Sequence, residues 1–533
     1  MDSKKQTLKN ISYENAETEG AERYLSQDID ITLNKNLFDK YLAKVFELRP
    51  NIKEIYEQTQ DIDLVSYDRR HIRENKNPVT RNRKHELIDV VSSKVKKLLG
   101  SKIAESVAKQ LKGNDSVSTT QHSASLGHYV LKLVLQNALP YFNSDNPNLA
   151  NVIVLACAGV SFNNSSTPRS LLLHTNKGLD YLPFFGRSAD ATPVIYHPAY
   201  EYEAVEEMLK EVSKIRQENG IDESQERLVK SVLEEIYASP HVLSQESFTD
   251  QLAVTNHHLF NKIFKTYPGK VPNLVFIPQE EVVTDLLLKY HLDHKTTLNN
   301  VLFDPVMHGL IEKYFDKVDG AFNLKKFKGT FLFWGYDREE KNRLQLFRQG
   351  NFLISLNGNF KVELTPDSLR KNLEEKRLIP SVMLTFFVLA FYYGLFLTGA
   401  YKQSYDLPKL LAKYIKLLKE YGDEEGTKAT EGLVTTNLIV PSSLLYIKKH
   451  TGIYLPATAL DIVTNSDKQS SWNEIFDSLR TIPFSEVIVK MFPIIYNRLC
   501  PQKEKEETLA KLSEQDIDEF TKLPSKIPPI VNL

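Results

Sequence analysis

The sequence has few cysteines, no excess of either charge and no motif that defines a reaction. Its two cysteines, Cys157 and Cys500, lie far apart in the chain. This excludes a disulfide framework and a zinc site built mainly on thiolates. The 67 basic residues balance the 68 acidic ones, so the chain as a whole is not attracted to nucleic acid, and no strong nucleic-acid signal is present. Glycine-rich dinucleotide, P-loop, nucleophile-elbow, kinase and EF-hand motifs are all missing.

Long apolar runs are also scarce. The segment from Pro380 to Tyr401 has no charged residue and approaches the roughly 20 residues that span a bilayer. Hydroxyl groups and two glycines interrupt it, and no second segment of this kind occurs, which favours a buried helix and no membrane span. Peripheral membrane association through 380–401 is the alternative. The N-terminal residues lack a signal-peptide core, so we expect a cytoplasmic protein.

The composition is typical of a globular protein, with 41% hydrophobic and 25% charged residues among 533. That length predicts two or three domains, or one domain with large insertions. The predicted segments are a polar leader at 1–30, a helical segment at 31–115, an α/β core at 116–327 with a helical insertion at about 201–270, a β-rich hairpin region at 328–364 and a helical C-terminal region at 365–533.

Short apolar runs that alternate with helical patterns predict the core. A β-prone run begins at Ser116, a near-continuous apolar run begins at Asn151, and shorter runs cover Thr192–Tyr196 and Pro272–Ile277. A helix is predicted from Gly127 to the residue before Pro140. Strands separated by helices favour a parallel sheet. The predicted fold class is therefore helix-rich α/β, with a parallel-sheet core, a helical insertion, a β-hairpin region and a mainly helical C-terminal part.

The β-rich region carries one strong turn signal. Asn357-Gly358 lies between the strand-like runs that begin at Phe352 and Phe360. A two-residue hairpin turn needs positive φ at both central positions, which asparagine and glycine tolerate best. The sequence therefore predicts a hairpin here with a two-residue turn.

Polar side chains follow the first predicted strand and precede the predicted helix. Thr120, Gln121 and His122 lie in this passage, and His128 lies in the first turn of the helix. Ligands of parallel sheets collect beyond the carboxyl ends of strands, where helix N-termini present free N–H groups. We predict that His122 and His128 act as acid–base groups or phosphate contacts and that Thr120 and Gln121 bind substrate. The alternative is that both histidines are structural.

A second polar loop follows the apolar run that begins at Asn151. It contains Asn163, Asn164, Ser166 and Arg169, whose amide, hydroxyl and guanidinium groups suit a carboxylate or phosphate. If the two strands pair, both loops face one crevice. Asparagine and serine are also ordinary turn residues, which is the structural alternative. Gln403, which follows the apolar 380–401 segment, is a further predicted substrate-binding residue.

The passage from Gln121 to His128 resembles the His-x-Gly-His region of class I nucleotidylyl-transfer folds, in which a histidine at a helix start contacts phosphate. The resemblance is confined to this passage, its first histidine is displaced, and no Lys-Met-Ser-Lys-Ser-like stretch follows. It implies phosphoryl or adenylyl transfer. The predicted function is a cytosolic enzyme of transferase or ligase type that acts on a small anionic metabolite, without a predicted metal. A non-catalytic helical interaction protein is the alternative. Cofactor and oligomeric state stay open.

Overall fold

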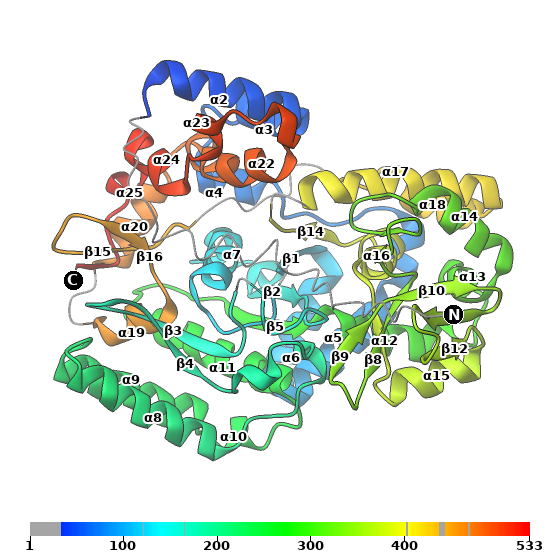
Figure 1. The fold of residues 1–533 in the computed structure, drawn as a ribbon, viewed down its shortest axis with the longest axis horizontal. Helices are drawn as coiled ribbons and strands as arrows, with labels where there is room; N and C mark the ends of the chain where they lie inside the picture. Colours follow the sequence, from blue (N-terminus) through cyan, green and yellow to red (C-terminus); the bar gives the residue numbers. More distant parts are fainter. Residues whose placement is uncertain are drawn as a thin grey trace, which may run out of the picture.

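The computed structural model describes residues 33–120, 122–164, 166–400, 403–435, 443–466 and 470–532. A four-stranded parallel sheet lies at its centre, in the order β14-β1-β2-β5 (Figure 1). The strands are β1 (Ser116–Thr120), β2 (Asn151–Ala156), β5 (Asn273–Pro278) and β14 (Phe396–Thr398). The predicted helix-rich α/β class with a parallel core is confirmed.

The sequences of the two middle strands differ, but both are buried along their whole length. β2 is apolar, as a strand covered on both faces should be. β1 is mostly hydroxylated, and its hydroxyl groups are satisfied inside the protein: Ser116 donates to the carbonyl of His71, and Thr119 donates to the carbonyl of Thr398. Hydrogen bonding of this kind lets a polar strand lie in the interior.

Helices pack on the sheet and around it. The helix α7 (His128–Ala138) connects β1 to β2 and packs on both strands, which confirms the helix predicted before Pro140. The helix α11 (Phe248–Ile263) packs on β5. It ends the predicted helical insertion, which also contains α8 (Tyr202–Gln217), α9 (Glu223–Val232) and α10 (Pro240–Leu243). The helices α5 (Pro78–Leu99) and α6 (Ser101–Gly113) pair with each other beside the sheet.

The strand predicted at Thr192–Tyr196 is wrong. Val194–Tyr196 form a 3-10 turn, and the N–H groups of Val194 and Ile195 donate to Val160 and Ala158. Pro193 has no N–H group, so the segment makes only an isolated bridge with Ser161 instead of a ladder. A hairpin that the sequence did not predict precedes it, formed by β3 (Ser170–Thr175) and β4 (Gly178–Pro183).

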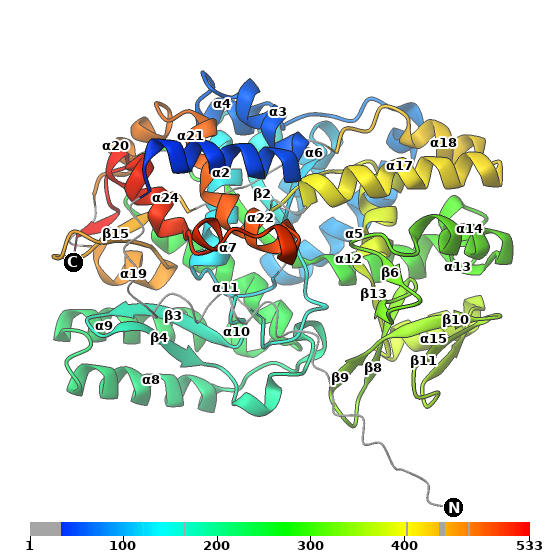
Figure 2. The same ribbon diagram turned by 45° about the horizontal axis from the view of Figure 1, so that its top comes forward.

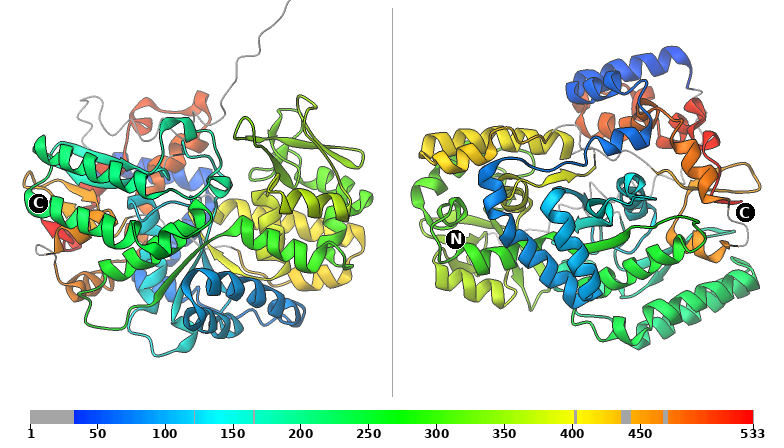
Figure 3. Two further views of the ribbon diagram at one scale, coloured as in Figure 1. Left: turned by 90° about the horizontal axis from the view of Figure 1, so that it is seen from below. Right: turned by 180° about the vertical axis from the view of Figure 1, so that it is seen from behind.

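The β-rich part projects from the helical body (Figures 2 and 3). Its strands are β8 (Phe333–Asp337), β9 (Asn342–Leu344), β10 (Leu346–Gln349), β11 (Phe352–Ser355), β12 (Lys361–Glu363) and β13 (Leu378–Pro380). The predicted hairpin is confirmed as β11 paired with β12. Its predicted two-residue turn is wrong, because Ser355 bonds to Phe360 across a longer loop in which only Gly358 has positive φ.

The apolar segment after Pro380 is not a single helix. It forms α16 (Val382–Phe386) and a π-helical turn at Phe387–Tyr392, and then enters the central sheet as β14. Gly394 makes this change of direction with φ +70, and a Cβ there would lie 2.1 Å from the side-chain amide of Asn75. Within the described part of the chain, no helix is long and apolar enough to cross a membrane.

The C-terminal part is mainly helical and packs against the N-terminal helices. It contains α17 (Gln403–Tyr421), α18 (Glu424–Thr430), α19 (Ala459–Thr464), α20 (Trp472–Leu479), α21 (Phe484–Ile488), α22 (Phe492–Leu499) and α24 (Glu514–Thr521). The helix α2 (Lys35–Leu48) lies along α22 (Figure 2), where the rings of Tyr41 and Tyr496 are in contact. Chain segments from opposite ends of the sequence therefore share one core.

Candidate functional site

A cavity of about 240 Å³ lies at the carboxyl edge of the central sheet. All four strands end beside it, which is where ligands bind in open parallel sheets. The β-rich part and the start of α16 close the opposite side. The side chains that line it include Thr119, Thr120, Cys157, Gln279, Thr330, Trp334, Ser381, Gln403 and Asp406.

Gln403, a predicted substrate-binding residue, connects strands β1 and β14 at one side of this cavity. Its side-chain oxygen accepts a hydrogen bond from Thr119 at 2.7 Å, and its amide nitrogen donates to the carbonyl of Leu397 at 2.8 Å. A Cβ at Gly399 would lie 2.2 Å from the Gln403 oxygen, so glycine permits this close approach. Both polar atoms of Gln403 thus already have protein partners, and the side chain forms part of the cavity wall.

Cys157 and Glu280 form a buried pair behind the cavity. The thiol donates to one carboxylate oxygen of Glu280 at 3.1 Å, and the N–H groups of Ala158 and Gly159 both donate to the same carboxylate at 2.9 Å. Burial and the neighbouring carboxylate raise the pKa of Cys157 well above its usual value. Burial also raises the pKa of Glu280, while the three donors oppose that shift. A protonated thiol is a weak nucleophile, which argues against a catalytic role for Cys157. The pair instead has a structural role, because its hydrogen bonds hold the chain that follows β2.

The cavity has little charge of its own. Among its described lining residues, Asp406 is the only one with a side chain of the Asp, Glu, Lys, Arg or His type. Three helices begin at the cavity: Gln279 is the first residue of α12 (Gln279–Leu286), Ser381 caps α16, and Gln403 is the first residue of α17. The hydroxyl protons of the lining threonines are donated within the protein, among others to the carbonyls of Thr398, His122 and Phe333, so these groups are not free donors.

The chains that follow β1 and β2 run side by side. The N–H group of Cys157 donates to Thr120 at 2.8 Å, and the N–H group of Ser123 donates to Cys157 at 2.9 Å. Thr120, a predicted substrate-binding residue, lines the cavity, and its hydroxyl group lies 3.3 Å from the N–H group of His122. Gln121 lies outside the described residues. The structure therefore brings Thr120 and Gln403 to one cavity, with His122 close by in sequence.

His128 lies away from this cavity, at the start of α7. Burial and the positive charges of His174 and Lys132 lower the pKa of His128 to about 3, so its imidazole is neutral at physiological pH. Its Nδ1 atom is buried and has no hydrogen-bond partner within the described residues. The neighbouring His174 lies 2.7 Å from a carboxylate oxygen of Asp461 through its own Nδ1. The acid–base role of His128 stays a prediction, and His128 does not belong to the described lining of the cavity.

The second predicted loop is held by its own hydrogen bonds. The Asn164 oxygen accepts from the N–H group and the hydroxyl group of Ser166 at 3.0 and 2.7 Å, and the Asn164 amide donates to the carbonyl of Ser161. Arg169 pairs with Asp190 at 3.0 Å. Asn163 donates through its backbone to Asp190. None of these four predicted side chains belongs to the described lining of the cavity, and the turn geometry accounts for the asparagine and serine.

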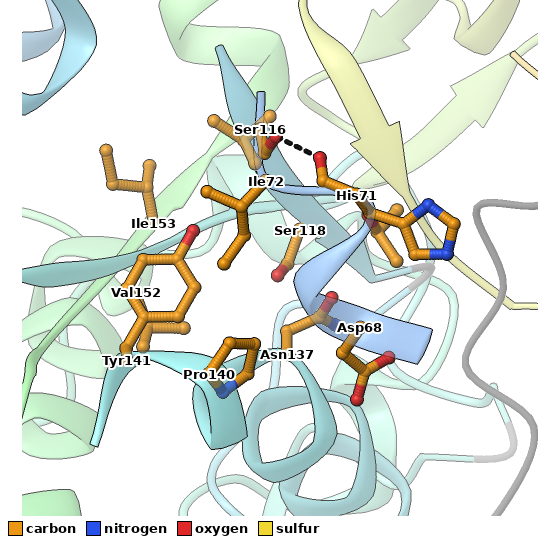
Figure 4. A pocket seen from close by; sticks show the side chains of 12 residues that line it. Asp68, His71, Ile72, Ser116, Ser118, Asn137, Pro140, Tyr141, Val152 and Ile153 are labelled. Carbon is orange, nitrogen blue, oxygen red and sulfur yellow. Dashed lines mark hydrogen bonds between the residues drawn. The ribbon is translucent and has the colours of Figure 1, made fainter. Parts of the chain in front are cut away.

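A smaller cavity of about 20 Å³ lies at the start of β1 and β2, on the opposite edge of the sheet (Figure 4). Asp68 and His71 line it, and the hydroxyl group of Ser116 donates to the carbonyl of His71. Asp68 accepts from the Gln136 amide at 3.0 Å, but its second oxygen and the Nε2 atom of His71 have no partner within the described chain. The space holds about one water molecule. It is therefore too small for a metabolite.

Asp68→Asn is expected to gain stability relative to the wild type as the pH rises. Burial raises the pKa of Asp68 well above its usual value, more than the Gln136 hydrogen bond lowers it. A raised native pKa means that the native state loses stability as the pH rises from about 4, by up to about 1.4 kcal/mol per pH unit. Urea unfolding of both proteins at pH 5, 6 and 7 measures this difference. A difference that does not change with pH would contradict the prediction.

The described residues contain no group of three or more His, Cys, Asp or Glu side chains that is arranged to hold a metal ion. No protein-family model matches the chain, and neither does any curated protein. The assignment of a function therefore depends on the geometry alone.

The residues that β5 and the β-rich part contribute to the cavity were not predicted from the sequence. Gln279 and Glu280 directly follow a predicted strand, so the rule that selected Thr120 applied to them as well. Trp334 gave no usable signal, because only the fold brings it to the sheet edge, whereas Asp406 lies in the first turn of the helix that begins with the predicted Gln403.

Proposed function

We propose that this chain is an enzyme that binds a small metabolite in the cavity at the carboxyl edge of the sheet. The observation that carries the proposal is the cavity itself, since all four parallel strands end at it. Its volume of about 240 Å³ is somewhat below the 300–1,000 Å³ that is typical of sites for drug-sized ligands. Thr119, Thr120 and Gln403 form one wall. The ligand is correspondingly small.

An anionic group of the metabolite, as predicted from the sequence, is held in this proposal by a hydroxyl group. The Ser381 hydroxyl group lines the cavity and accepts only from the N–H group of Leu384, so its proton is available to such an anionic group. Arg169 is not part of this contact, because its guanidinium pairs with Asp190.

A ligand screen with a blocked cavity tests the proposal. Val382 lines the cavity and is 39% exposed, so Val382→Trp fills space there without disturbing the core. We expect a nucleotide or organic acid from the screen to stabilise the wild type by about 2.7 kcal/mol at one hundred times its Kd. The same compound should not stabilise Val382→Trp.

Arg169→Ala is the matched comparison, because this side chain lies outside the described cavity lining. The same compound is expected to stabilise Arg169→Ala as much as the wild type. A compound that stabilises Val382→Trp fully would place binding elsewhere and contradict the proposal. A compound that fails only with Arg169→Ala would restore the anion contact predicted from the sequence.

A further inference from the structure

Gln279 is a polar side chain that lines the cavity and makes no side-chain hydrogen bond within the described part of the chain. It is 4% exposed and is the first residue of α12, directly after β5. Its side-chain amide makes no hydrogen bond to any described residue, whereas Gln403 in the same cavity uses both of its polar atoms. The Gln279 amide atoms are not among the fully buried polar atoms that lack a partner, so they are reachable from the cavity and available to a ligand or water.

We propose that Gln279 binds the metabolite, and that the group it recognises is an uncharged edge with a hydrogen-bond donor beside an acceptor, as in a carboxamide or a nucleobase. This inference rests on the proposed function, since it assumes that the cavity is the binding site. It adds the residue and the chemistry of recognition, which the cavity alone does not provide.

The chemistry of the side chain selects this class of group. A glutamine amide offers two N–H donors and an oxygen acceptor on one planar edge, so a partner with a donor and an acceptor side by side satisfies both. A carboxylate or phosphate satisfies only the N–H groups and leaves the Gln279 oxygen facing negative charge. The nearby acidic side chains also disfavour a negatively charged ligand group, because Asp406 lines the cavity and Glu280 lies directly behind Cys157.

The shape of the cavity is consistent with a small planar ligand. Trp334 of β8 provides an aromatic wall, and the Arg343 guanidinium lies 4.1 Å from the centre of its ring. The cavity volume is about 240 Å³. This is enough for one ring with its substituents. Any anionic group of the metabolite then lies at another part of the cavity.

Two pairs of probes that differ only in the recognised group test the inference: nicotinamide with nicotinate, and benzamide with benzoate. Binding to the full chain is measured by ligand-detected NMR titration for the wild type, Gln279→Leu and Gln217→Leu, in which an exposed glutamine of α8 is changed. We expect each amide to bind the wild type at least ten times more tightly than its carboxylate. Gln279→Leu should lose this preference, and Gln217→Leu should keep it.

Thermal unfolding of the unliganded proteins provides a second readout. Because the Gln279 amide has no partner in the described chain, Gln279→Leu should unfold at the same temperature as the wild type or higher. Lost binding without lost stability supports a ligand-binding role, whereas a lowered melting temperature overturns it in favour of a structural one.

The outcomes separate this inference from the proposed function. If the probes bind the wild type and are excluded by Val382→Trp, but amides and carboxylates bind equally, the cavity proposal stands and the role of Gln279 is wrong. If Val382→Trp binds the probes as well as the wild type does, the cavity proposal fails as well. If the wild type binds neither amide, the recognition chemistry proposed here is overturned.

Discussion

Replacing Glu280 with alanine is expected to lower the free energy of unfolding by about 3–5 kcal/mol, because it leaves several buried donors without an acceptor. The carboxylate receives hydrogen bonds from the N–H groups of Ala158 and Gly159 and from the Cys157 thiol. These three residues form the chain directly after β2, at the edge of the cavity. Losing these hydrogen bonds should therefore also weaken the binding of any ligand in the cavity. Guanidinium unfolding measures the first effect, and titration of a ligand from the screen measures the second.

Two further variants make this prediction specific. Glu280→Gln keeps the size of the side chain but places an NH₂ group among N–H donors, so an intermediate loss of about 2 kcal/mol is expected. Glu234→Ala removes an exposed glutamate and should change stability by less than about 0.5 kcal/mol. Equal losses for Glu280→Ala and Glu234→Ala would show that the buried carboxylate does not hold the chain after β2.

Asp461→Ala is expected to have an effect of similar size, about 3–5 kcal/mol, by separating the β3–β4 hairpin from α19. One carboxylate oxygen accepts from the backbone of His174 at 2.8 Å, and the other interacts with the His174 ring at 2.7 Å and with the backbone of Thr458 at 2.8 Å. Asp461 is 1% exposed, so water cannot replace these contacts. Limited proteolysis should then cut the hairpin faster than in the wild type.

The pH dependence provides a second test of Asp461. Burial by itself raises the pKa of this carboxyl group, but the charge of His174 and the hydrogen bonds to His174 and Thr458 outweigh burial, and the net pKa is lowered. A lowered native pKa stabilises the protein above the unfolded value of about 4 and ceases to do so as the pH falls below it. The deficit of Asp461→Ala should therefore shrink below pH 4. Asp319→Ala, at an exposed position, is the control and should show no deficit at any pH.

Much of the central sheet followed from local patterns. The apolar run of β2, the run of β5 and the helix before Pro140 were all identifiable, because a strand buried on both faces and a helix ended by proline leave clear signals. β14 was not identifiable. Its three residues belong to a longer apolar segment, and only their pairing with β1 makes them a strand.

The candidate site was predictable only in part. The rule that polar residues after parallel strands face a ligand placed Thr120 correctly at the sheet edge. The same rule does not distinguish a residue that binds a ligand from one that stabilises a turn. Asn164 and Ser166 are of the second kind, because they form hydrogen bonds with each other. Trp334 comes from the β-rich part, and no local pattern reveals which distant segment will cover a sheet edge.

The position of β14 in the chain also has a consequence for biosynthesis. Thr119 and Thr398 bond to each other across a sequence separation of 279 residues. While the ribosome is still making the intervening chain, one side of β1 has no neighbour and its backbone groups are available to other polypeptides. Contacts of such long range also slow folding. The nascent polypeptide should therefore depend on chaperones until residues 396–398 have left the exit tunnel, and fragments that stop before them should aggregate.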